Sequence, residues 1–196
     1  MRIRSLFVAL VLGACCLVAT AQMACGPHGQ MGSAAAPSQA LDVLLTQLEK
    51  EIVPAAKAMP ADKYDFAPSA ATFAAGSPEK FDTVRTFGQQ VAHVAEANFY
   101  FYSALSGLKP DVDISKISKM ATKEEAVKSL ESSLAFAHKA IATITVANAF
   151  ETIKGADGMN TRATVAAFGV AHGYDHYGQM VEYLRMNGIV PPSSAK

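Results

Sequence analysis

One stretch of the sequence, residues 160–188, decides the fold; it reads NTRATVAAFGVAHGYDHYGQMVEYLRMNG. Its apolar, aromatic and imidazole side chains recur every three or four residues, which predicts a helix with one face turned towards a core. The residues on this single stripe are Val165, Phe168, His172, His176, Gln179 and Tyr183. Asn187 and Gly188 end the helix, because glycine is favoured just beyond a helix C-terminus, and Pro191 and Pro192 prevent its continuation.

Three further helices are predicted upstream of this one. The first begins near Ser38 and is disturbed at Pro54. The second opens at Ser77-Pro78, a cap residue followed by proline, and runs to about Leu105. The third follows the capping box Thr122-Lys123-Glu124-Glu125. Each of the three carries apolar side chains at helical spacing.

No segment alternates in the manner of a β-strand over a useful length, and the residues around Gly155–Gly158 are predicted to form a loop. Four apolar stripes without strands are buried most simply in an all-α four-helix bundle. The composition agrees, because a chain of 196 residues with 51% hydrophobic and 17% charged residues is not a disordered one. Lys+Arg and Asp+Glu number 17 each, so no broad basic field is present to bind nucleic acid.

The N-terminus is predicted to be an export signal. Arg2 and Arg4 precede an uncharged apolar run over residues 6–21, which ends in the small-x-small pattern Ala19-Thr20-Ala21. This run is shorter than the ~20 residues needed to cross a bilayer core. The expected location is therefore outside the cytoplasm, periplasmic or secreted.

A competing pattern, Leu12-Gly13-Ala14-Cys15, resembles the cleavage box of bacterial lipoproteins, and cleavage there gives a protein attached to the membrane by lipid at Cys15. The residues after Cys15 stay apolar, which favours the lipid-free exported form.

The domain organisation follows from these boundaries. After cleavage at residue 21 only Cys25 remains, so an internal disulfide is excluded, although Cys25 can pair with another chain. His28 lies beside it in a Gly-, Ala-, Ser- and Pro-rich segment and is expected to be solvated. The predicted parts are a signal peptide over 1–21, a flexible leader over 22–37, a helical domain over 38–192 and a C-terminal tail over 193–196.

The histidines of the last helix are the first candidates for chemistry. His172 and His176 are four residues apart, which places their Cβ atoms about 5–6 Å apart on one helix face. The pattern alone leaves open whether they bind metal or are ordinary hydrogen-bonded core histidines. A reactive metal site needs a third ligand and an open position. His138 flanks the third apolar stripe and is expected to be a hydrogen-bonded core-edge residue, and periodicity places His93 roughly 100° or more from the main stripe of its helix, facing solvent.

Three regions carry a resemblance to a known family. They are residues 59–68 (MPADKYDFAP), residues 87–95 (FGQQVAHVA) and residues 172–192, which begin with His172-x3-His176. Together they resemble the DinB/YfiT-like metalloenzyme family over roughly residues 38–192. The resemblance implies a four-helix bundle with a long crossover connection. It also implies a divalent metal ion, commonly nickel or zinc, bound by His93, His172 and His176, and it overrides the periodicity argument for His93.

The resemblance also implies a function. Characterised members of the family include thiol S-transferases and a thiol-dependent isomerase, and a dication on three imidazoles can equally activate water for hydrolysis. We therefore expect a metal-dependent transferase or hydrolase acting on a small molecule that the sequence does not identify. Gln179 is expected to line the pocket, and Tyr183 to line it or pack in the core. The alternative is a non-catalytic helical module that binds metal or a small ligand, for instance as a homodimer.

Two further expectations concern the neighbourhood of the metal. Below about pH 6 the histidines are expected to take up protons and release the ion. Asp175, Glu96 and Asn98 lie near the ligands in sequence and are expected to be solvated or structural. A ferritin-type di-iron site is excluded, because the chain lacks two Glu-x-x-His motifs and two further facing glutamates.

Overall fold

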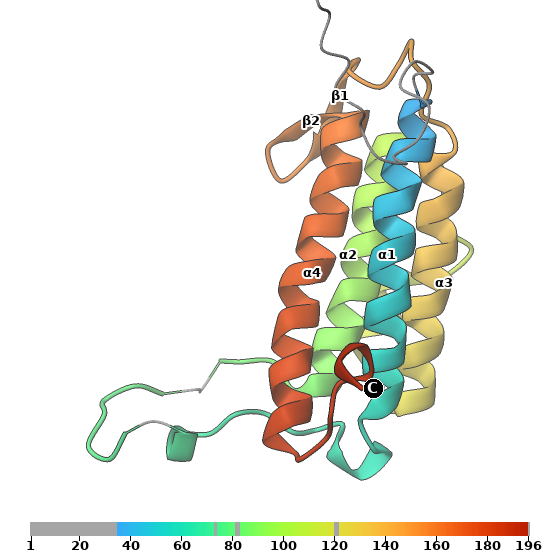
Figure 1. The fold of residues 1–196 in the computed structure, drawn as a ribbon. Coiled ribbons are helices and arrows are strands. Elements are labelled where there is room, and N and C mark those ends of the chain that lie inside the picture. Colours follow the sequence, from blue (N-terminus) through green and yellow to red (C-terminus); the bar gives the residue numbers. More distant parts are fainter. Residues whose placement is uncertain (1–34, 73, 81–82, 120–121, 196) are drawn as a thin grey trace, which may run out of the picture. The chain divides into compact units, whose positions relative to one another are not determined.

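The computed structural model describes residues 35–72, 74–80, 83–119 and 122–195. The expectations for the export signal, Cys15, Cys25, His28 and most of the leader lie outside the described residues. Within them, four long helices pack together (Figure 1): α1 (Pro37–Ala58), α2 (Phe87–Ser106), α3 (Lys123–Ile141) and α4 (Arg162–Met186). Short 3-10 turns cover Ala61–Lys63, Ala70–Thr72, Ile114–Lys119 (η3) and Pro192–Ser194. The predicted four-helix bundle is confirmed.

The helix directions explain the long crossover. α1 packs against α3 and α4, and α2 also packs against α3 and α4. At one end of the bundle Lys123, at the start of α3, donates to the carbonyl of Lys57 at the end of α1, 2.7 Å away. At the other end Arg162, at the start of α4, donates to the carbonyl of Leu105 at the end of α2. α2 and α3 are therefore parallel neighbours (Figure 1), and the segment that follows α2 must return along the bundle, with η3 packed on α2.

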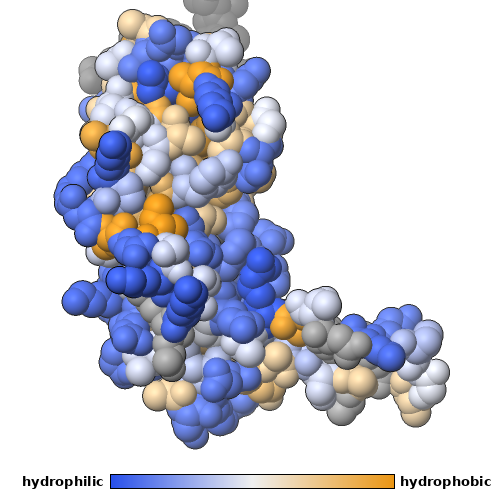
Figure 2. Space-filling view, turned by 180° about the vertical axis from the view of Figure 1, so that it is seen from behind, coloured by the Kyte–Doolittle hydropathy of each residue, from blue (hydrophilic) through white to orange (hydrophobic). Residues whose placement is uncertain are grey.

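The core consists of apolar side chains from all four helices. Fully buried large residues include Leu45, Leu48, Ile52, Phe87, Tyr102, Leu105, Leu130, Leu134 and Ile141. α2 is buried over the widest arc, because α3, α4 and η3 all pack against it. The face of the molecule seen in Figure 2 is mainly hydrophilic, and its apolar groups form separate spots. No helix of the described residues is long and apolar enough to cross a membrane.

The start of α2 differs from the prediction. Ser77-Pro78 does not open a helix; α2 begins ten residues later, at Phe87. Thr86 caps it, because its hydroxyl accepts from the backbone N–H of Gln89 and the Gln89 side chain accepts from the backbone N–H of Thr86. The next backbone N–H groups, of Phe87 and Gly88, donate to carbonyls of the preceding loop at 2.8 Å. These bonds satisfy the free donors of the helix end, which Ser77-Pro78 lacks.

α1 continues through Pro54 to Ala58, whereas the sequence predicts a disturbance there. A proline inside a helix removes one backbone hydrogen bond. Pro54 lies in the last turn and a half, where Ala55, Ala56 and Met59 are fully buried against the core, and this packing holds the helix. The predicted ends of the other helices are confirmed: Thr122 forms the capping box of α3, and Gly188 follows α4 with a φ of +72°.

A short hairpin corrects the prediction that the chain has no strands. β1 (Thr152–Ala156) and β2 (Met159–Thr161) pair antiparallel between α3 and α4. Asp157 and Gly158, with φ of +46° and +81°, form the two-residue turn that an Asp-Gly pair favours. Strands this short show little alternation in a sequence, so the Asp-Gly pair was the only signal. The hairpin packs against α2 and α4.

Candidate metal centre

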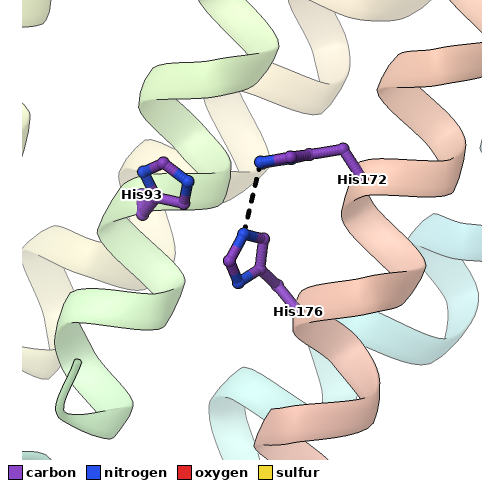
Figure 3. Close-up of side chains that lie close together, drawn as sticks. All are labelled: His93, His172 and His176. Carbon is purple, nitrogen blue, oxygen red and sulfur yellow. Dashed lines mark hydrogen bonds between the residues drawn. The ribbon is translucent and has the colours of Figure 1, made fainter. Parts of the chain in front are cut away.

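Three histidines from two neighbouring helices meet inside the bundle. His93 lies in the second turn of α2, and His172 and His176 lie one turn apart in the middle of α4. Figure 3 shows all three rings turned into the space between the two helices. The ring centroid of His93 is 5.1 Å from that of His172 and 4.7 Å from that of His176. One ring nitrogen from each residue lies within 4.8 Å of the others.

The spacing of these nitrogens fits a shared metal ion. The Nε2 atoms of His172 and His176 are 3.2 Å apart. Two imidazoles bound at 2.0–2.1 Å to one tetrahedral ion have their nitrogens about 3.3–3.4 Å apart. Three imidazoles are also a donor set that suits zinc, nickel and related ions, and they leave a coordination position open. This group could hold a metal ion.

The rings are held in the neutral form that metal binding requires. Burial, followed by the nearby charges of Arg85 and His172, lowers the pKa of His93 to about 4. Burial, followed by His172 and His93, likewise lowers the pKa of His176 to about 4. Burial also lowers the pKa of His172, against the opposing charges of Asp175 and Asp157. The sequence predicts that protonation of the histidines releases the metal below about pH 6, which assumes ordinary histidine pKa values. Because the pKa values are lowered, we expect this release at a lower pH.

Two glycines on α4 allow this close approach of helices. A Cβ on Gly173 would lie 2.4 Å from Cδ2 of Leu48 in α1, and a Cβ on Gly169 would lie 2.8 Å from the hydroxyl oxygen of Tyr102 in α2. Neither distance is compatible with a side chain in this packing. Because Gly169 and Gly173, before and after His172 on α4, carry no side chain, α4 can lie this close to its neighbours.

Gln90 is a site residue that the sequence did not reveal. It lies one turn before His93 on α2, is 2% exposed, and its Oε1 is 2.6 Å from Nδ1 of His176. Its Nε2 donates to Oε1 of Gln179, 2.8 Å away. A polar residue on the buried stripe of α2 was the available signal, but only the fold supplies its partners on α4.

The other residues named from sequence take different positions. Gln179 binds Gln90, and Tyr183 is buried, donates to the backbone carbonyl of Arg85 at 3.2 Å and packs on Phe66. Asn98 is 1% exposed and donates to Ser133, which is a structural role.

His138 fulfils its expected role at the edge of the core. Its Nδ1 lies 2.5 Å from a carboxylate oxygen of Asp42, and its Nε2 lies 3.1 Å from one of Glu49.

Two pockets adjoin His93. The first, of about 310 Å³, is lined by Arg85, Gln89, Ala92, His93, Glu96 and Ser118. The second, of about 280 Å³, is lined by His93, Glu96, Ala97, Tyr100, Phe101, Ile114, Asp157 and His172. Glu96, which the sequence predicts to be solvated or structural, borders both pockets. Within the described part of the chain, neither Arg85 nor Glu96 forms an ion pair.

The fold and the site together define the class of this protein. It is a four-helix bundle with a crossover connection and a potential metal centre made of three histidines. The comparison with protein families places the chain within that class: residues 44–180 match the DinB superfamily, and this span contains all three histidines. The chain belongs to the DinB superfamily. No curated protein matches its sequence.

Proposed function

We propose that this protein binds one divalent metal ion, nickel or zinc, through His93, His172 and His176. The observation that carries the proposal is the convergence of three imidazoles, two of them with Nε2 atoms 3.2 Å apart. Two of the three rings have pKa values of about 4, so protons do not compete for them at neutral pH. Among the described residues no carboxylate belongs to the cluster, which favours nitrogen-preferring ions over magnesium or calcium.

The proposed activity is metal-dependent transfer or hydrolysis on a small molecule. A dication at this position lowers the pKa of a bound thiol or water and so supplies a nucleophile near neutral pH. The pockets beside His93 give a small molecule access to the cluster, and Arg85 and Glu96, which form no ion pair with the described residues, offer it one positive and one negative contact.

Metal content of untagged protein tests the binding proposal. We expect one ion per chain in the parent and a loss of bound metal in His93→Ala and His176→Ala. His138→Ala is the matched control, because it removes a histidine of the same bundle that is bound to carboxylates instead. As much metal in His176→Ala as in the parent would contradict the proposal.

Activity assays separate the two kinds of function. Metal-loaded and chelator-treated protein are compared with thiols plus electrophiles, and with simple esters and amides. Turnover that needs the metal and is lost in His93→Ala supports the enzyme. Metal binding without turnover in either assay instead selects the alternative, a non-catalytic module that binds metal or a small ligand.

We further propose that the protein is exported, periplasmic or secreted, with no nucleic-acid partner. The support is the sequence alone: Arg2 and Arg4, the apolar run over 6–21 and the balanced charge. The mass of the mature protein from a secreting host tests this, with Gln22 expected as the first residue. A lipid-modified N-terminus at Cys15, abolished by Cys15→Ser, would instead establish the anchored form.

A further inference from the structure

A chain of hydrogen bonds links the buried His176 to a carboxylate on the surface. Nδ1 of His176 is 2.6 Å from Oε1 of Gln90, Nε2 of Gln90 is 2.8 Å from Oε1 of Gln179, and Nε2 of Gln179 is 3.1 Å from Oδ2 of Asp175. The path leaves α4 at His176, crosses to α2 and returns to α4. Its two ends are adjacent in sequence, and the hydrogen bonds between their side chains run through Gln90 and Gln179.

The carboxylate determines the direction of every bond in this chain. An ionised Asp175 can only accept, so Gln179 must turn its NH2 group towards it. The carbonyl of Gln179 then faces Gln90, which must present its NH2 group in turn. The carbonyl of Gln90 is left facing Nδ1 of His176, and this nitrogen must carry the proton. Reversing the amides would place the Gln179 carbonyl against the carboxylate, oxygen against oxygen.

We propose that Asp175 acts through Gln179 and Gln90 as a positioning residue that fixes the Nδ1–H tautomer of His176 and turns the Nε2 lone pair into the histidine cluster. This inference rests on the proposed metal site for its purpose, since a ligand nitrogen must be unprotonated. Metal-bound histidines commonly donate their other N–H to such an acceptor, which orients the ring and raises its basicity.

His172 shows by contrast what the relay supplies. Its Nδ1 is buried and has no hydrogen-bond partner among the described residues. Its Nε2, 3.2 Å from the unprotonated Nε2 of His176, can carry the proton and donate it there in the absence of metal. In the metal-free protein these contacts favour the opposite tautomer in His172, with the proton on the nitrogen that faces the cluster, so His176 is the ligand prepared in advance.

The test reads the tautomer directly, by nitrogen NMR of protein labelled at histidine and free of metal. We expect the proton of His176 on Nδ1 in the parent and a shift of its population towards Nε2 in Asp175→Asn, since an asparagine can present either group to Gln179. Glu182→Gln is the control: it removes another exposed carboxylate of α4, one paired with Arg185. Adding Gln179→Glu to Asp175→Asn should restore the parent state, because a carboxylate at position 179 again only accepts from Gln90.

A second measurement follows zinc affinity by competition with a chelator. We expect Gln90→Leu to weaken zinc binding about 10–100-fold, the usual effect of losing such a partner, and Asp175→Asn to weaken it less. A His176 proton on Nε2 in the metal-free parent, or equal spectra for Asp175→Asn and Glu182→Gln, would overturn the relay. Absence of zinc binding with the proton on Nδ1 would refute the metal site while leaving the relay intact.

Discussion

The two histidine regions of this bundle place the same side chain in opposite environments. The cluster of His93, His172 and His176 lies between α2 and α4, where burial lowers the pKa of each ring. His138 lies between α1 and α3. Burial lowers its pKa too, but hydrogen bonds to Asp42 and Glu49 outweigh this and raise it.

The difference shows what separates a candidate ligand from a structural histidine. Rings without carboxylate partners stay neutral and keep a lone pair for an ion. A ring between two carboxylates has a raised pKa, which favours its cationic form, and both of its nitrogens are engaged.

The largest expected effect is the metal-dependent stabilisation. An ion present at 100 times its Kd stabilises the folded state by about 2.7 kcal/mol if it binds only that state. We expect the free energy of unfolding of the parent and of His138→Ala to rise by about this amount on adding metal, and that of His172→Ala not to rise. Urea denaturation with and without metal measures it. An equal rise in His172→Ala would erase the contrast between the two regions.

A matched pair of glycine variants tests the packing that the cluster needs. In Gly173→Ala the new methyl group would overlap Leu48, which is fully buried and has little room to move. We expect a destabilisation of about 1–3 kcal/mol, typical of overpacking, and weaker metal binding.

Gly178→Ala, on the same helix, is the control for that variant. A Cβ there meets nothing within 4 Å, so the higher helix propensity of alanine should stabilise the protein by up to about 1 kcal/mol. The titration of His138, followed by NMR, should be unchanged in both variants. Equal stability of the two variants would show that α4 has room to move away from α1.

The sequence was sufficient where local signals and tertiary contacts agree. The capping box at Thr122 and the glycine at position 188 correctly bound α3 and α4. Ser77-Pro78 is an equally good local start, but the chain instead begins α2 at Phe87, where carbonyls of Tyr64 and Phe66 accept its first N–H groups. That choice depends on a loop folding back and is invisible to periodicity.

The residues of the site also divide into those that local spacing predicts and those that depend on the fold. The i, i+4 spacing places His172 and His176 on one face, and the fold confirms it. His93 could be placed only by resemblance, because α2 is covered by α3, α4 and η3 together, and a single stripe does not describe such a helix. The hydrogen bonds of Gln90 could not be predicted from the sequence, because bonds between two helices produce no recognisable spacing of residues along the chain.

A smaller effect is expected from the pH dependence that His138 adds to stability. Its pKa is raised in the folded state, so its contribution is fully present below the unfolded pKa of about 6.5 and is lost as the pH rises through the folded value. The stability difference between the parent and His138→Gln should therefore shrink between pH 6 and pH 9, by about 0.2–1 kcal/mol for such partly exposed pairs. Urea denaturation at both pH values measures it, and 1 M salt should reduce it. A difference that grows with pH would have the wrong sign for a cation held by Asp42 and Glu49.

The smallest expected effect is a near absence of change in metal affinity between pH 7 and pH 5.5. Two ligands with the ordinary pKa of about 6.5 would lose roughly 70-fold in affinity over this interval, because protons occupy most of the rings at the lower pH. With pKa values of about 4, His93 and His176 stay unprotonated throughout, so their combined loss should be less than twofold. Competition with a chelator of known pH dependence measures the affinity, and His138→Gln should behave like the parent. A loss of tenfold or more would mean that water reaches the cluster rings in solution and that burial does not lower their pKa values.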